Sequence, residues 1–325
     1  MKSAQLHNSN QILLVGAGAM SQEYLRVLRA LEVELTVVCR SKSSAKKFSE
    51  QTGYPAVSGG LKKFFQKDKN NIKTAIVAVG VENLASVSIE LLQHGINKIL
   101  IEKPAGIYLK EVTDLSELAD HKKASLFVAY NRRFYTSTQK AKELIKLDGG
   151  ATSFYFEFTE WSHLIAPLVK GESVKERWFL SNSSHVVDLA FFLGGKPKEI
   201  ATYIRGKDNL SWHPSASVFS GSGVTVDDAL FSYHADWTGP GSWSVEIVTN
   251  KNRLILKPLE QLQIQRIGSV NIKHVELSDA IDKSFKPGLY KQVEGFMNDN
   301  FTDCCTISDQ QEMMKIYNKI SNYKV

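Results

Sequence analysis

An apolar strand that runs straight into a glycine-rich turn constrains the fold of this chain more than any other feature. Residues 12–15 are Ile-Leu-Leu-Val, and Gly16-Ala17-Gly18-Ala19-Met20-Ser21 follows directly. In turns that bind a dinucleotide, the first glycine makes the bend and the second lets the backbone approach the pyrophosphate. A small third residue, here Ser21, allows the following helix to pack close to the strand. The sequence therefore predicts a strand–turn–helix unit with a phosphate site, at which Gly16, Gly18, Ala19 and Met20 contact the ligand.

The segment about twenty residues further on bears on which dinucleotide is bound. Sheets that prefer NAD place Asp or Glu there, on the ribose hydroxyls, whereas this chain has Cys39-Arg40-Ser41-Lys42-Ser43. Arg40 would attract a 2′-phosphate with its forked donors, and Ser41 and Ser43 would add hydroxyl donors. The sequence predicts NADP(H) rather than NAD(H). The alternative is that Arg40 is an ordinary surface residue and the pocket discriminates poorly.

Strand-like and helix-like segments alternate through the first 130 residues. The expected apolar strands are residues 11–15, 34–39, 74–79, 98–101 and 125–129. The expected helices are residues 20–31, 44–52, 61–66, 84–94 and 109–121. This alternation is typical of an α/β fold, in which a doubly wound parallel sheet, a Rossmann domain, has helices on both faces.

The pattern changes after residue 130. Residues 152–159 alternate aromatic and polar side chains, which is typical of a half-buried strand. Further strand-like runs are residues 200–204, 229–235, 243–248 and 253–256, and helical patterns occur at 184–193, 293–297 and 310–320. Strands in succession predict an α+β domain with a mostly antiparallel, open-faced sheet. We therefore expect an NADP-binding domain over residues 1–130 and a domain for substrate binding and oligomerisation over residues 131–325.

Composition argues against several classes of protein. Residues 1–10 are polar and lack the apolar centre of a signal peptide, and no apolar run reaches the ~18 residues of a membrane span. A cytoplasmic protein with no membrane partner is expected. Cys39, Cys304 and Cys305 lack metal-ligand spacing, so buried or unreactive thiols and no metal site are expected.

Basic residues are concentrated in one segment, although the net charge of +6 is modest. Nine Lys or Arg residues, Lys69 among them, lie between Arg40 and Lys73, against the two acids Glu50 and Asp68. Solvated helix faces explain most of them. No nucleic-acid-binding motif and no interleaved aromatic residues accompany them, so nucleic acid ranks last among the partners and an anionic small molecule is preferred.

A second motif, Glu102-Lys103-Pro104-Ala105, ends the apolar strand at residues 98–101. At the carboxyl end of a parallel strand, this position brings the Lys103 ammonium beside a bound nicotinamide. Neither motif is decisive alone. Together, at this spacing, they indicate a nicotinamide-dependent oxidoreductase, with Glu102 and Lys103 counted among the cofactor-binding residues.

The two motifs together resemble the Gfo/Idh/MocA family, the group of glucose–fructose oxidoreductase and inositol dehydrogenase. Residues 129–134 (Ala-Tyr-Asn-Arg-Arg-Phe), 178–195, 290–296 and 307–320 extend the resemblance over essentially the whole chain. The resemblance implies a Rossmann domain, a second domain whose open sheet often forms an oligomer interface, and a cis peptide bond before Pro104. It also implies that Lys103 and His185 face the substrate beside the nicotinamide. A homo-oligomer, a dimer or a tetramer, is expected.

Histidine suits acid–base work near neutral pH, and an ammonium group can bind a hydroxyl and stabilise alkoxide charge. Lys103 and His185 are thus the expected catalytic residues, and Trp178, Ser181 and Asp188 are the expected substrate-binding residues. The family commonly has an aspartate where this chain has Ser181. Ser181 cannot act as a carboxylate partner of His185, but it could cap the helix. Asp188 would orient His185 or the substrate, or would serve as a structural acid, and Trp178 could stack on a sugar.

These observations predict NADP(H)-dependent hydride transfer at a carbinol or ketone carbon of a sugar or nucleotide-sugar, which analogy extends to surface-polysaccharide synthesis. An anionic sugar is compatible with the basic charge balance. Ser181 keeps open the alternative of a non-catalytic NADP-binding sensor of the same fold. A second alternative is transient oxidation by tightly bound cofactor, which gives net epimerisation or glycoside cleavage.

Overall fold

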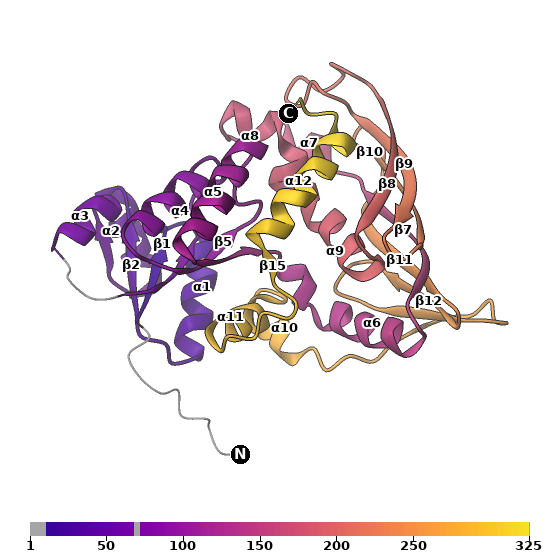
Figure 1. Cartoon of the computed structure of the whole chain (residues 1–325), viewed down its shortest axis with the longest axis horizontal. Helices are drawn as coiled ribbons and strands as arrows, with labels where there is room; N and C mark the ends of the chain where they lie inside the picture. The colour runs from indigo at the N-terminus through magenta and orange to yellow at the C-terminus, as the bar shows by residue number, and fades with distance from the viewer. Residues whose placement is uncertain (1–10, 68–71, 325) are drawn as a thin grey trace, which may run out of the picture.

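The computed structural model describes residues 11–67 and 72–324. The predictions for residues 1–10, and those for Asp68 and Lys69 of the basic segment, lie outside this part. The described chain forms two sheets with helices around and between them, and α9 (Ser184–Gly194) and α12 (Ile307–Ser321) lie between the sheets (Figure 1).

The first sheet confirms the predicted Rossmann topology. Its order is β3-β2-β1-β4-β5-β6-β15, and all neighbouring strands are parallel except the last pair. The strands are β1 (Ile12–Val15), β2 (Leu35–Cys39), β3 (Ala56–Ser58), β4 (Thr74–Val77), β5 (Lys98–Glu102), β6 (Ser125–Ala129) and β15 (Cys305–Thr306). Strand order reverses between β1 and β4, and ligands bind at such a reversal, outside the carboxyl ends of the strands.

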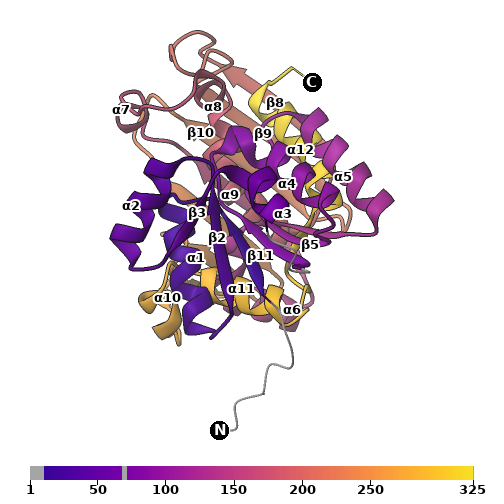
Figure 2. The same cartoon turned by 90° about the vertical axis from the view of Figure 1, so that its left-hand side faces the viewer.

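Helices cover both faces of this sheet (Figure 2). One layer contains α1 (Ala19–Ala30), α2 (Lys42–Thr52) and α11 (Leu289–Met297). The other contains α3 (Gly60–Lys67), α4 (Leu84–Gln93), α5 (Leu109–Lys122) and α12. Successive side chains of a strand point to opposite faces, so Ile12 and Leu14 pack in the first layer and Leu13 and Val15 in the second. Burial on both faces explains the continuous apolar runs of these strands.

The second sheet is mostly antiparallel, as predicted, with the order β14-β13-β12-β11-β7-β10-β9-β8 and one parallel pair, β7 with β10. Its strands are β7 (Ala151–Phe158), β8 (Pro197–Arg205), β9 (Val218–Thr225), β10 (Leu230–Asp236), β11 (Trp243–Thr249), β12 (Asn252–Leu256), β13 (Gln263–Arg266) and β14 (Ile272–His274). The remaining helices are α6 (Thr136–Leu147), α7 (Ser162–Ile165), α8 (Glu172–Glu176) and α10 (Ala280–Ser284). Strands β3, β9, β13, β14 and β15 and helices α6, α7, α8 and α10 are additions to the sequence-based prediction.

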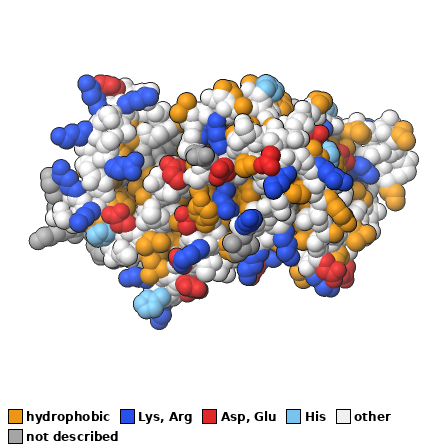
Figure 3. Space-filling model, turned by 90° about the horizontal axis from the view of Figure 1, so that it is seen from above, with side chains coloured by type: hydrophobic (Ala, Val, Ile, Leu, Met, Phe, Trp, Pro, Cys, Tyr) orange, Lys and Arg blue, Asp and Glu red, His pale blue; other side chains and the backbone are white. Residues whose placement is uncertain are grey.

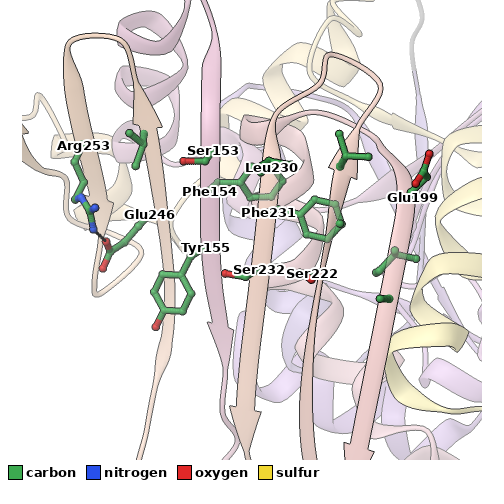
Figure 4. Close-up of a pocket in the computed structure, with 15 residues that line it drawn as sticks. Ser153, Phe154, Tyr155, Glu199, Ser222, Leu230, Phe231, Ser232, Glu246 and Arg253 are labelled. Carbon is green, nitrogen blue, oxygen red and sulfur yellow. Dashed lines mark hydrogen bonds and ion pairs between the residues drawn. The ribbon is translucent and has the colours of Figure 1, made fainter.

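The two faces of the second sheet differ. Phe154, Phe156 and Phe158 of β7 are buried against the side that α9 covers. The opposite face carries Tyr155, Ser232, Glu246 and Arg253, and no helix of the described residues covers it (Figure 4). A hollow of about 860 Å³ lies on this outer face, and none of the predicted site residues lines it.

Basic side chains of the N-terminal domain lie on its surface. Arg40, Lys42, Lys46 and Lys47, at or on α2, are exposed, as solvated helix faces predict. Figure 3 shows Lys and Arg scattered among neutral side chains at the left-hand end, where the N-terminal domain lies in Figure 1. No helix in the described part of the chain combines the length and apolarity that a membrane crossing needs.

Candidate active site

The glycine turn leaves β1 at the point where strand order reverses. Gly16 has φ +126°, and a Cβ there would lie 2.2 Å from the Ala78 carbonyl oxygen, so only glycine fits. Gly18 is the N-cap of α1, and a Cβ there would meet no protein atom within 4 Å. The space beside Gly18 is therefore free for a ligand. Ser21, fully buried, donates its hydroxyl to the Ala78 carbonyl over 3.1 Å and so fastens α1 to the end of β4.

This arrangement fits a dinucleotide. The first turn of α1 contains no acidic residue, so the N–H groups of Ala19 and Met20 and the positive end of the helix dipole would attract a pyrophosphate. The turn is thus bent by Gly16, open at Gly18 and held in place by Ser21.

The end of β2 presents a positively charged, hydroxyl-rich surface. Arg40 is exposed directly after β2. Ser41 is the N-cap of α2, and its Oγ accepts a hydrogen bond from the Ser44 backbone N–H over 3.0 Å. The Ser41 and Ser43 hydroxyls lie 3.1 Å apart, and the first turn of α2 contains no acid. These residues suit an anionic group, although part of the Ser41 hydrogen-bonding capacity is used by the helix cap.

Lys103 projects from the segment that follows β5. Its peptide bond to Pro104 is cis, as the family resemblance implies. The preceding residue, Glu102, accepts a hydrogen bond from the buried Tyr24 hydroxyl over 2.7 Å, which connects β5 to α1. Lys103 is partly buried, and its Nζ donates to the Ser181 carbonyl oxygen.

Burial lowers the pKa of Lys103 from 10.5 to about 8. The nearby Glu102 carboxylate opposes this change, whereas the positive charge of Arg132 reinforces it. At pH 7 the amine is still protonated, and it titrates just above neutrality. A proton donor with a pKa near the working pH is suited to general acid–base catalysis.

His185 lies one residue into α9, directly after a π-helical turn at Phe179–Ser183. π-Helical turns are rare in proteins, and those that occur are often found at functional sites. The His185 ring is 8% exposed, and its buried Nδ1 has no hydrogen-bond partner among the described residues. Burial lowers the pKa of His185 well below 6.5, and the positive charges of Arg132, Lys103 and Lys286 lower it further. The imidazole is therefore neutral at pH 7 and able to accept a proton.

Ser181 and Asp188 have partners other than His185. The Ser181 hydroxyl donates to the Arg177 carbonyl over 3.1 Å. Ser181 therefore does not form the N-terminal helix cap that the sequence suggests. Asp188, 3% exposed, accepts two hydrogen bonds from Arg133, at 2.8 and 2.6 Å. A buried ion pair of this kind is typical of a structural acid. It joins the start of the second domain, at Arg133, to α9, at Asp188.

Glu160 is a site residue that the sequence reasoning missed. It follows β7 and is 6% exposed. Its carboxylate accepts hydrogen bonds from the Asn182 side chain at 3.0 Å and from the Ser183 hydroxyl at 2.6 Å. Burial raises its pKa, and the Lys103 ammonium lowers it in turn. Glu160 thus brings a carboxylate to the π-helical turn at which the family's aspartate is absent.

A cavity of about 300 Å³ lies beside Glu160. Trp178, another predicted site residue, lines it and is 9% exposed. The other lining residues are Thr159, Glu160, Trp161, Leu164, Ile165, Asn182, Ser242 and Trp243. Aromatic and polar side chains of this kind suit a small polar molecule such as a sugar.

The cysteines lie outside this site. Cys39, Cys304 and Cys305 are buried and unpaired. Burial raises the pKa of Cys305 to about 12 and that of Cys304 to about 11, so both are protonated thiols. Within residues 11–67 and 72–324, no group of three or more His, Cys, Asp or Glu side chains could hold a metal ion.

Comparison with known proteins assigns a family to the first domain. Residues 10–130 match the model of the oxidoreductase family with an NAD-binding Rossmann fold, Gfo/Idh/MocA. This match places residues 10–130 in a family of oxidoreductases. No curated protein matches the sequence.

Solved structures share the fold over nearly the whole chain. Levoglucosan dehydrogenase in complex with NADH and levoglucosan is 16% identical, with 96% of each chain covered and a TM-score of 0.76. UDP-N-acetylglucosamine 3-dehydrogenase GnnA from Acidithiobacillus ferrooxidans is 14% identical over 95% of this chain and 96% of that one, with a TM-score of 0.74. An oxidoreductase from Agrobacterium radiobacter in complex with NAD+, L-tartaric acid and magnesium is 12% identical over 96% and 95%, with a TM-score of 0.79. At these identities the likeness establishes the fold.

Proposed function

We propose that this protein transfers hydride between NADP(H) and a carbinol or ketone carbon of a sugar. One observation carries the proposal: the Lys103 Nζ donates a hydrogen bond to the Ser181 carbonyl oxygen, in the π-helical turn just before His185, and its charge lowers the pKa of His185. The names of two structural relatives, a levoglucosan dehydrogenase and a UDP-N-acetylglucosamine dehydrogenase, support a sugar or nucleotide-sugar substrate. A role in surface-polysaccharide synthesis extends the nucleotide-sugar proposal.

The proposed division of labour follows the two domains. Residues 1–130 hold the dinucleotide through Gly16, Gly18, Ala19 and Met20, and residues 131–325 supply most of the substrate site. The dinucleotide, when bound, supplies the hydride chemistry. The protein must then bind the substrate oxygen, stabilise its charge and move its proton.

Lys103 and His185 perform these tasks in the proposed mechanism. The Lys103 Nζ donates a hydrogen bond to the substrate oxygen and stabilises alkoxide charge as it develops. In the direction of oxidation, neutral His185 accepts the hydroxyl proton. We assign this transfer to Nε2, because Nδ1 is enclosed. In the direction of reduction the same groups act in reverse: protonated His185 returns the proton to the oxygen, and the Lys103 ammonium, with a pKa of about 8, again stabilises the charge on that oxygen.

Three further residues act on these two in the proposal. Glu160 keeps a negative charge near Lys103 and so favours its ammonium form. Trp178 contributes a wall to the substrate cavity. Asp188 positions His185 rather than binding the substrate. Its hydrogen bonds to Arg133 hold α9, and with it the His185 backbone, in place.

The preference for NADP(H) over NAD(H) rests on Arg40 and on the hydroxyls of Ser41 and Ser43. Structural relatives contain NADH or NAD+, so the preference has to be tested directly. The purified protein should be titrated with NADPH and with NADH while energy transfer from tryptophan to the reduced nicotinamide is followed. Tight NADPH binding with NADH at least tenfold weaker supports the proposal, and the reverse order refutes the role of Arg40.

The sensor alternative shares the cofactor site and differs at the substrate site. The cavity beside Glu160 and Trp178, together with the retained Lys103 and His185, favours catalysis. Assays of NADPH oxidation with a panel of keto-sugars decide between the two, because a sensor binds NADPH and reduces none of them. Product formation without a change in absorbance at 340 nm would indicate transient oxidation instead. A homo-oligomer, formed through the open sheet face, and a cytoplasmic location also remain proposals.

A further inference from the structure

Arg132 is a partly buried cation, and one of its guanidinium nitrogens lacks a hydrogen-bond partner among the described residues. It lies next to Arg133, which is paired with Asp188, yet the two arginines differ. The Nε of Arg132 is buried with no hydrogen-bond partner among the described residues. Its guanidinium lies 4.8 Å from the centre of the Trp243 ring, which supports one face of it. Buried polar groups in proteins nearly always have partners, so an unsatisfied guanidinium nitrogen calls for an explanation.

Arg132 lines a cavity of about 340 Å³, here called the arginine pocket. Its other lining residues are Ser242, Trp243, Lys257, Pro258, Leu259 and Glu260. Ser242 and Trp243 also line the cavity beside Glu160, so the two cavities share a wall. A molecule in the cavity beside Glu160 therefore lies next to the arginine pocket.

The residues that line the pocket include two cations, Arg132 and Lys257, and one acid, Glu260, which favours an anion. Lys103 and Lys286 lie near enough to His185 to act together with Arg132 on its pKa. Four acids oppose these cations. Burial lowers the pKa of Arg132, whereas the negative charges of Glu260, Glu160 and Glu102 act to raise it. Glu157 lies 3.7 Å from the Lys257 Nζ, a long and partly exposed ion pair, and Glu260 is exposed at the edge of the pocket. None of these four acids hydrogen-bonds to the buried Arg132 Nε.

We propose that the arginine pocket binds an anionic group of the substrate, so that the preferred substrate is an acidic sugar bearing a carboxylate or phosphoryl group. The guanidinium fork matches the oxygen geometry of either group, and Lys257 adds a point charge. This inference rests on the proposed function, because it assumes that a sugar occupies the neighbouring cavity. It adds a substrate class and the residues that select it.

The test measures binding rather than turnover. Isothermal titration calorimetry on the NADP+-saturated protein at low ionic strength would compare D-glucose, D-glucuronate and D-glucose 6-phosphate. At least one anionic sugar should bind tenfold or more tightly than glucose, and its identity distinguishes a carboxylate from a phosphoryl substrate. Arg132→Met should abolish this preference, and Arg132→Lys should restore part of it, because a single charge replaces the fork.

Lys257→Met and Lys251→Met provide a matched pair. Both lysines are exposed, and each has a carboxylate at a similar distance, 3.7 Å to Glu157 and 3.8 Å to Asp148. Only Lys257 lines the pocket, so Lys257→Met should weaken binding of the anionic sugar several-fold and Lys251→Met should leave it unchanged. The pair also tests the proposal if Arg132→Met fails to fold.

Equal binding of glucose and both anionic sugars, or a preference that survives in a folded Arg132→Met, would overturn the proposal. So would failure of both anionic sugars to bind to protein that holds NADP+. These results leave the proposed function standing if NADPH still binds and neutral keto-sugars are still reduced. Loss of NADPH binding in the wild-type protein would instead remove the proposed function itself.

Discussion

Replacing Lys103 by methionine should stabilise the protein at pH 7 and remove its activity. Burial lowers the pKa of Lys103 from 10.5 to about 8. Each pH unit between the unfolded and folded pKa values corresponds to about 1.4 kcal/mol, so holding the ammonium costs the folded state about 3 kcal/mol below pH 8. Methionine has a similar length and no charge, but it leaves the Ser181 carbonyl without its donor, which costs about 1 to 2 kcal/mol.

The expected net gain in the free energy of unfolding is therefore about 1 to 2 kcal/mol, or roughly 2 °C in Tm for a chain of this size. The gain depends on pH. Because the folded-state pKa lies below the unfolded one, the penalty on the wild-type protein is complete below pH 8 and disappears as the pH rises to 10.5. Loss of the donor to the substrate oxygen should lower kcat by about 10²- to 10³-fold.

Thermal unfolding of the cofactor-free protein at pH 7 and at pH 10 measures the stability change, and steady-state reduction of a keto-sugar measures kcat. Lys110→Met is the control, because Lys110 is exposed on α5 and pairs with Asp114. It should change stability by less than about 0.5 kcal/mol at either pH. A Lys103→Met protein that melts below wild type at pH 7, by a margin that is the same at pH 10, would refute the argument from burial.

The remaining predictions concern the cofactor site and Glu160. Arg40→Glu should weaken NADPH binding tenfold or more, by loss of charge-assisted bonds and gain of repulsion, and should leave NADH binding within about twofold; equal losses for both would contradict the assignment. Gly16→Ala should lower the unfolding free energy by about 2 kcal/mol or more, since its Cβ would meet the Ala78 carbonyl at φ +126°. Gly18→Ala should keep the wild-type Tm and lose NADPH affinity at least tenfold. A normal Tm for Gly16→Ala, or normal NADPH affinity for Gly18→Ala, would count against this geometry. Glu160→Gln should lower kcat about 10- to 100-fold and shift the alkaline limb of the pH–rate profile for ketone reduction below the wild-type value of about 8, because a negative charge that favours the Lys103 ammonium is gone. An unchanged alkaline limb would show that Glu160 does not influence the pKa of Lys103.

The parallel sheet could be predicted because burial on both faces of a strand leaves a plain record in the sequence. Runs such as residues 12–15 and 125–129 are apolar without interruption, and β6 was predicted with its observed bounds. The glycine turn was equally accessible, since its role depends on neighbours within a few residues. Local signals of this kind do not depend on the rest of the fold.

Strand β9 could not be predicted for a physical reason. It contains Gly221 and Gly223, which suggest a loop in a sequence. In the structure a Cβ at Gly221 would lie 2.5 Å from the Ala201 carbonyl oxygen, and one at Gly223 would lie 2.0 Å from that of Glu199. Both glycines are needed because β8 packs so closely, and that neighbour is distant in the sequence.

The site shows the same limit. Glu160 is more than twenty residues from Asn182 and Ser183, which bury its carboxylate, so nothing near it in the sequence distinguishes it from a surface acid. Arg132 and Arg133 are adjacent and identical in type. Only their tertiary partners distinguish them: Arg132 stacks on Trp243 and keeps a guanidinium nitrogen unpaired among the described residues, whereas Arg133 forms an ion pair with Asp188.

Strand β15 has a consequence for how the chain folds as it is synthesised. The edge of the Rossmann sheet at β6 is completed by Cys305 and Thr306, and the Phe127 ring of β6 stacks on Phe301. A ribosome adding about 5 to 20 residues per second needs on the order of ten seconds or more to reach this segment after β6 has emerged. During that interval β6 presents an unpaired, apolar edge, the kind of surface that recruits other strands. The nascent chain is thus most prone to aggregation after its first domain has been translated, and synthesis of residues 301–306 ends that exposure.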